Sequence, residues 1–81
     1  MNDTANETAR LLGLLLGTNV SPGDDVSMGT SAAWDSMKHI EIIMTFEERF
    51  GISFEPEDIP LLTSQALLAA KVEELVFEHR A

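Results

Sequence analysis

Three side chains in the segment 34–52, WDSMKHIEIIMTFEERFGI, are of types that could do chemistry. Asp35, Ser36 and His39 are the residue types of a nucleophilic triad, in which a histidine takes the serine proton and a carboxylate orients the histidine. Neighbouring residues on a helix point about 100° apart, so Asp35 and Ser36 cannot align through His39. A chain of 81 residues also leaves little room for a substrate cavity. We therefore expect that the protein is not an enzyme, and we interpret His39 as a partly buried residue of a helix.

Ser36 allows a different chemistry because it lies at the start of a helix. The segment predicts a helix that begins at residue 35 or 36 and stops before Gly51. A helix N-terminus has unpaired N–H groups and a partial positive charge, and both favour a bound phosphate. A phosphodiester formed on Ser36 Oγ would lie in that field. The local sequence by itself favours a simpler interpretation, in which Asp35 or Ser36 caps the helix and Trp34 packs against it as a hydrophobic staple.

The other elements that would position this helix are also helical. Apolar residues recur at helical spacing over residues 4–16 and again over 64–79, and a short helical turn fits residues 56–60, because proline is tolerated in a first turn. One face of the last helix consists of Leu68, Val72, Leu75 and Val76. Residues 17–34 predict a long loop, held down by Val20, Val26 and Met28. With the helix at 35–50, the chain predicts one all-α domain over residues 1–81, an irregular four-helix bundle of three main helices and one short helix.

The helix at 35–50 has apolar residues on two sides. Rotation by about 100° per residue places the branched and aromatic ones together on a side that we assign to the core: His39, Ile42, Ile43, Phe46 and Phe50. A second side, here called the apolar stripe, consists of Met37, Ile40 and Met44, and three acids border it: Glu41, Glu47 and Glu48. Methionine adapts to several partners, so we expect the stripe and its glutamates to serve docking rather than folding. The alternative is a wide core, in which the stripe packs under the long loop.

Composition limits the partners and the place of the protein. Five Lys and Arg stand against fourteen Asp and Glu, for a net charge of −9. This charge disfavours binding to nucleic acid and to anionic membrane surfaces, and it favours a basic partner protein. The simpler interpretation is that the acids only keep a small domain soluble. The chain has no cysteine, and the acids at 24–25 and 55–58 lack EF-hand spacing, so we expect no metal site. The apolar run at 11–16 is too short to span a membrane and lacks a basic flank. We expect a cytoplasmic monomer.

From Asp35 to Ile52 the sequence resembles the acyl carrier proteins and the related peptidyl carrier proteins. That family has Asp-Ser followed by Leu or Met at the start of its second helix, here Asp35, Ser36 and Met37. The pattern continues in register with an apolar residue, a glutamate, further apolar residues, an acidic pair, a phenylalanine and Gly-Ile: Ile40, Glu41, Ile42, Ile43, Met44, Glu47, Glu48, Phe50, Gly51 and Ile52. The resemblance implies the four-helix layout of the family over the whole chain.

The resemblance also implies a covalent cofactor and a set of partners. Ser36 would be the attachment point of 4′-phosphopantetheine, moved from coenzyme A by a phosphopantetheinyl transferase with Mg²⁺, and Asp35 would assist the transfer. The arm ends in a thiol that holds an acyl or aminoacyl group as a thioester. The apolar stripe and its glutamates would then dock basic patches on the transferase, on an acyl- or aminoacyl-loading ligase, and on downstream transferases and synthases.

Four features differ from the carriers of fatty-acid synthesis. They are the lead-in TSAAW before Asp35, Lys38 in place of an acid, Pro60 in the third-helix region, and Ser64 after Thr63. These departures favour a carrier in a specialised pathway, such as polyketide, nonribosomal peptide, lipid-modification or aminoacyl-transfer chemistry. The rival interpretation is an unmodified, small acidic helical adaptor, whose stripe binds a partner helix or a basic patch.

Overall fold

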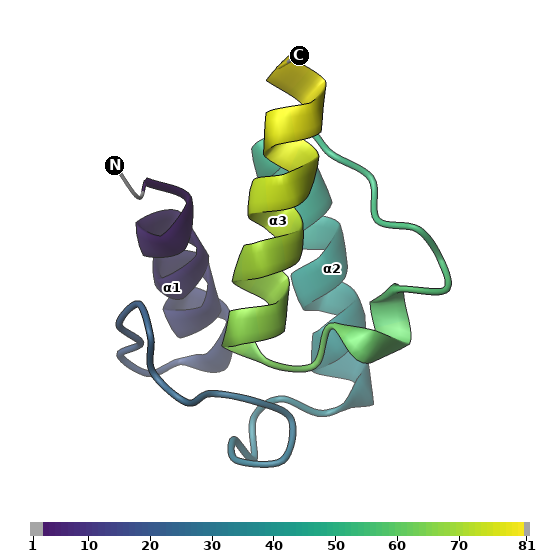
Figure 1. Ribbon diagram of the computed structural model, residues 1–81. Coiled ribbons are helices and arrows are strands. Elements are labelled where there is room, and N and C mark those ends of the chain that lie inside the picture. The colour runs from purple at the N-terminus through teal and green to yellow at the C-terminus, as the bar shows by residue number, and fades with distance from the viewer. Residues whose placement is uncertain (1–2, 81) are drawn as a thin grey trace.

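The computed structural model describes the backbone of residues 3–80 and the side chains of residues 4–78. Three α-helices and one short 3₁₀ helix follow one another along the chain: α1 (Asp3–Leu16), α2 (Ser36–Phe50), η1 (Ile59–Leu61) and α3 (Gln65–Arg80). The α-helices pack against one another in all three pairs, and α1 runs opposite to α2 and α3 (Figure 1). No β-strand occurs within the described part of the chain. The expected all-α bundle is confirmed.

The start and end of α2 follow from local chemistry. Asp35 has an extended backbone (φ −102°, ψ −173°), and its Oδ1 accepts a hydrogen bond of 2.8 Å from Lys38 N–H, one of the groups that a helix start leaves unpaired. At the other end Gly51 takes the left-handed conformation (φ 66°, ψ 40°), which glycine adopts without strain. Its N–H donates to the Glu47 carbonyl. The predicted helix is confirmed, with Asp35 as its cap.

The short helix begins later in the chain than predicted. The sequence suggested residues 56–60, whereas η1 covers 59–61 and residues 56–58 form a turn. In that turn the N–H of Asp58 donates to the Glu55 carbonyl over 2.9 Å. Pro56 and Pro60 both suit a first helical turn, because proline has no N–H to leave unpaired. In the structure Pro60, and not Pro56, lies in the first turn of η1. The predicted range is therefore wrong, because both prolines are compatible with the start of a helix.

The ends of α1 and α3 are marked by identifiable residues. Gly17 follows α1 in the left-handed conformation (φ 73°), and the N–H groups of Gly17 and Thr18 both donate to the Gly13 carbonyl. Gly13 approaches the chain so closely that a Cβ there would lie 2.7 Å from the Thr18 carbonyl oxygen. Ser64 Oγ accepts a hydrogen bond of 3.2 Å from Leu67 N–H and caps α3. The predicted ranges of both helices differ from the observed ones by a single residue at their ends.

The core lies between the three α-helices and is closed by the segments that connect them. It gathers apolar residues from every part of the chain: Leu11, Leu12, Leu16, Trp34, Ile42, Ile43, Phe46, Ile52, Phe54, Leu62, Leu68 and Val72. Leu75 and Val76, the remaining members of the predicted face of the last helix, are partly buried against this core. The predicted core face of α2 is confirmed, because His39, Ile42, Ile43 and Phe46 are buried.

The long loop over residues 17–34 is fastened to the start of α3. Three of its apolar side chains are partly buried against the core, as predicted: Val20, Val26 and Met28. The N–H of Met28 donates to the Thr63 carbonyl over 3.0 Å, and the N–H of Gln65 donates to the Val26 carbonyl over 2.8 Å. The buried side chain of Gln65 donates from Nε2 to two further carbonyls of the loop. These bonds hold residues 21–28 of the loop against the start of α3.

Candidate functional site

Ser36 is the first residue of α2, and its side chain is exposed. Asp35 caps the helix, so the capping interpretation is correct for Asp35 and does not apply to Ser36. The hydroxyl is therefore not needed to satisfy the helix start. Its place in the first turn puts it beside N–H groups that lack partners within the helix. An exposed hydroxyl in this field is accessible for modification, and the helix terminus would favour a phosphodiester formed on it.

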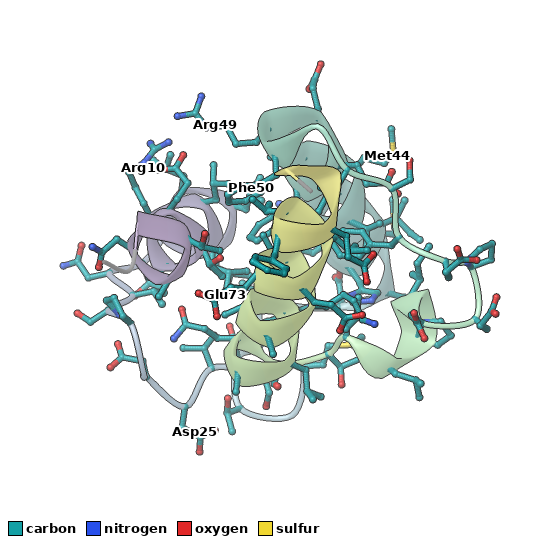
Figure 2. All side chains as sticks on the ribbon, turned by 45° about the horizontal axis from the view of Figure 1, so that its top comes forward. Arg10, Asp25, Met44, Arg49, Phe50 and Glu73 are labelled. Atoms are coloured by element: carbon teal, nitrogen blue, oxygen red, sulfur yellow. The ribbon has the colours of Figure 1, made fainter. Side chains whose placement is uncertain are left out.

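The apolar stripe of α2 is exposed along its length. Met37 is 83 % exposed, Ile40 54 % and Met44 63 %. Figure 2 shows the Met44 side chain pointing away from the bundle, on the side of α2 remote from α1. The alternative, in which the stripe packs under the long loop, is wrong. Three large apolar side chains on one helix face, with Ser36 at its end, form a surface that the fold itself does not cover.

The three acids that border the stripe differ in their surroundings. The Glu41 carboxylate accepts a hydrogen bond of 2.8 Å from Lys38 Nζ, and Glu48 is exposed. Glu47 is half-buried, and its Oε2 accepts a hydrogen bond of 2.9 Å from Phe54 N–H. This bond fastens the segment after α2 back onto the helix. This bond contradicts the prediction that Glu47 has no part in folding. Helical periodicity does not show the contact, because it forms only where the chain returns after α2. A docking function of Glu47 stays a prediction.

An open groove of about 450 Å³ lies at the C-terminal end of the stripe. Six residues line it: Met44, Thr45, Glu47, Glu48, Ile52 and Ser53. Apolar walls and two carboxylates therefore adjoin on one surface, an arrangement that suits a basic side chain with an apolar stem. Sequence reasoning missed Ile52 and Ser53, because they approach α2 only after the chain turns at Gly51.

Behind Ser36, the side chains of Trp34 and His39 form a buried hydrogen-bond chain. Trp34 is 1 % exposed, and its Nε1–H donates to His39 Nδ1 over 3.0 Å. The two rings stack with their centroids 6.1 Å apart. The other ring nitrogen, Nε2, lies 2.8 Å from the Ile59 carbonyl oxygen of η1. His39 is thus more buried than predicted. The pair was missed because Trp34 precedes the helix and has no place in its periodicity.

An ion-pair network joins α2 to α1. The Glu7 carboxylate lies 2.6 Å from Arg10 Nη2 on its own helix and 2.6 Å from Arg49 Nε on α2. Figure 2 shows the two arginines on the same side of the molecule. Hydrogen bonds from Arg10 and then from Arg49 lower the pKa of Glu7 to about 2. This network connects α1 to a part of α2 that does not belong to the stripe.

Searches of the described residues for a metal site and for a membrane span find neither. Among them, no cluster of three or more His, Cys, Asp or Glu side chains could hold a metal ion. None of the helices, as far as they are described, has the length and apolar character needed to cross a membrane. Comparison of the sequence with protein-family models and with curated proteins finds no match.

Proposed function

We propose that this chain is an acyl or aminoacyl carrier protein, with 4′-phosphopantetheine attached to the Ser36 hydroxyl. One observation supports the proposal most: the hydroxyl at the first residue of α2 is exposed and has no capping function, because Asp35 supplies the cap. The resemblance of residues 35–52 to carrier proteins points to the same residue. The proposal includes the irregular four-helix architecture of that family and a specialised rather than a housekeeping pathway.

In the proposed transfer, Ser36 Oγ attacks the phosphorus atom that bears the pantetheine in coenzyme A. An O–P bond forms at Ser36, the P–O bond to adenosine 3′,5′-bisphosphate breaks, and the serine proton passes to a base on the transferase. The first turn of α2 then compensates the phosphodiester charge with its free N–H groups and its dipole. Asp35 uses Oδ1 to hold Lys38 N–H, which leaves its other oxygen to assist the transferase-bound Mg²⁺ or to orient the serine.

The apolar stripe supplies the contact with partner enzymes in this proposal. Met37, Ile40 and Met44 give an exposed apolar surface, and Glu41 and Glu48 give it a negative border. A transferase, a loading ligase or a downstream synthase with a basic patch around an apolar pocket would complement both features. The thiol at the end of the arm would hold the cargo as a thioester. Because the stripe begins beside Ser36, a docked partner would lie within reach of that thiol.

The exposed stripe also supports a second candidate, an unmodified acidic adaptor that binds an amphipathic helix of a partner. This function requires the stripe and its acids and gives no role to the Ser36 hydroxyl. The two candidates therefore differ in one chemical respect. A carrier gains a covalent group at Ser36, whereas an adaptor keeps its encoded mass.

Incubation of the purified chain with coenzyme A, Mg²⁺ and a broad-specificity phosphopantetheinyl transferase tests the proposal. We expect intact-mass measurement to show one added phosphopantetheine on the wild type and none on Ser36→Ala. Because Ser36 is exposed, the variant should retain the wild-type free energy of unfolding within about 0.5 kcal/mol. A wild-type chain that keeps its encoded mass, under conditions that fully convert an established carrier, overturns the proposal and favours the adaptor.

A further inference from the structure

The residues on either side of Ser36 are joined to each other through their side chains. Trp34, two positions before Ser36, donates its Nε1–H to Nδ1 of His39, three positions after it. The backbone closes the same short segment a second time, because His39 N–H donates to the Asp35 carbonyl over 2.8 Å. The segment that bears the exposed hydroxyl is therefore bracketed by a buried contact, and that contact lies under it.

The donor and acceptor groups fix the direction of this hydrogen-bond chain. Tryptophan can only donate, so His39 Nδ1 must be the unprotonated nitrogen that accepts. The ring proton is then on Nε2, which donates to the Ile59 carbonyl over 2.8 Å. One neutral imidazole thus connects the end of the long loop, the first turn of α2 and the start of η1. A side chain without both a donor and an acceptor cannot make this connection.

We infer that His39 is a positioning residue for the modification of Ser36, acting through the Trp34–His39–Ile59 hydrogen-bond chain. This role rests on the proposed function, and it is one of positioning, not of proton transfer as in a catalytic triad. A phosphoryl acceptor must hold its oxygen in line with the bond that breaks, and a displacement of about 1 Å can cost about 10²-fold in rate. Because α2 begins at Ser36 itself, the hydroxyl depends on the fixed position of this first turn.

Three variants separate positioning from a general loss of stability. His39→Leu fills the space and leaves the Trp34 N–H and the Ile59 carbonyl without partners. His39→Gln offers one acceptor and one donor on its terminal amide. Val72→Ala, in the buried face of α3, lowers the stability of the core and leaves the hydrogen-bond chain intact. All comparisons are made at a temperature at which every variant is folded.

Two measurements report on the first turn of α2, one on its structure and one on the modification of Ser36. The exchange rate of the Lys38 amide proton reports the Asp35 cap next to Ser36, and the kcat/KM of a phosphopantetheinyl transferase reports the presentation of the hydroxyl. We expect His39→Leu to speed the exchange and to lower kcat/KM by about tenfold, part of the loss that a 1 Å displacement gives. His39→Gln should recover most of both values, and Val72→Ala should resemble the wild type in both.

The outcomes distinguish this inference from the proposed function. If His39→Leu keeps the wild-type exchange and kcat/KM, or if Val72→Ala loses as much as His39→Leu, His39 has only a structural role and the inference is overturned. If the wild type accepts no phosphopantetheine, the proposed function fails. The exchange rate of the Lys38 amide then still shows whether the Trp34–His39–Ile59 hydrogen bonds fix the first turn of α2. Exchange that is faster in His39→Leu but not in Val72→Ala supports this positioning, and unchanged exchange in His39→Leu rejects it.

Discussion

Truncation of Phe46 tests the division of α2 into a core face and an exposed apolar stripe. Phe46 is fully buried, and its ring centroid lies 5.8 Å from that of Phe50 at a tilt of 48°. Removal of a buried phenylalanine costs about 3–5 kcal/mol through lost burial and the cavity left behind, and the aromatic pair accounts for about 1 kcal/mol of this. In a domain of this size each kcal/mol shifts Tm by about 4–8 °C. Phe46→Ala should therefore lower Tm by about 12 °C or more.

Met44→Ala is the matched control, two residues earlier on the same helix. Met44 is 63 % exposed, so its truncation should change the free energy of unfolding by about 0.5 kcal/mol or less and should act mainly on partner affinity. Urea unfolding followed by circular dichroism gives the free energy of unfolding of both variants, and thermal unfolding gives their Tm. The comparison belongs at one ionic strength, because self-repulsion among the fourteen acids makes stability depend on salt. If Met44→Ala unfolds the protein and Phe46→Ala leaves it intact, the two faces are assigned wrongly and the apolar stripe is not the proposed docking surface.

Three further predictions concern docking, pH and a buried hydroxyl. Glu48→Lys should slow phosphopantetheine transfer, most at low salt. The same charge change at Glu73, which is exposed on α3 (Figure 2), should leave the transfer rate unchanged. Equal slowing by both variants would show a general effect of net charge rather than docking at the stripe. The folded-state pKa of Glu7, about 2, lies below its ordinary value of 4.5, so its contribution is fully present above 4.5 and is lost as the pH falls toward 2. In urea titrations Glu7→Gln should cost about 1 kcal/mol near neutral pH, and a cost that persists at the acidic limit would contradict this origin. Thr8→Val should raise the free energy of unfolding by about 1 kcal/mol, because the buried Thr8 hydroxyl has no hydrogen-bond partner among the described residues. A loss of stability would mean that this hydroxyl is satisfied.

Local chemistry explains why most of the helical framework could be predicted from the sequence. Asp35 and Gly51 define α2 by signals that act within a few residues, a side-chain cap and a left-handed glycine. The two faces of α2 follow from helical rotation alone, because burial of Phe46 and exposure of Met44 require only that one side of the helix meets the core. The short helix η1 could not be placed, since Pro56 and Pro60 satisfy the same local rule.

The contacts that complete the candidate site depend on distant parts of the chain. Gln65 fastens the long loop from more than forty positions away, and Glu47 meets Phe54 only after the chain has turned at Gly51. The Trp34–His39 pair requires a loop residue to fold under the helix start. No periodic pattern predicts such contacts, because they depend on how segments far apart in the sequence pack against one another.

The most direct test of the central claim is the location of the added group. Fragmentation of the transferase-treated protein in a mass spectrometer assigns the phosphopantetheine to a single residue. The carrier proposal predicts that the added mass lies on Ser36 and that no other serine is modified, with Ser36→Ala remaining at its encoded mass. An added mass on another serine, or modification that persists in Ser36→Ala, would contradict it.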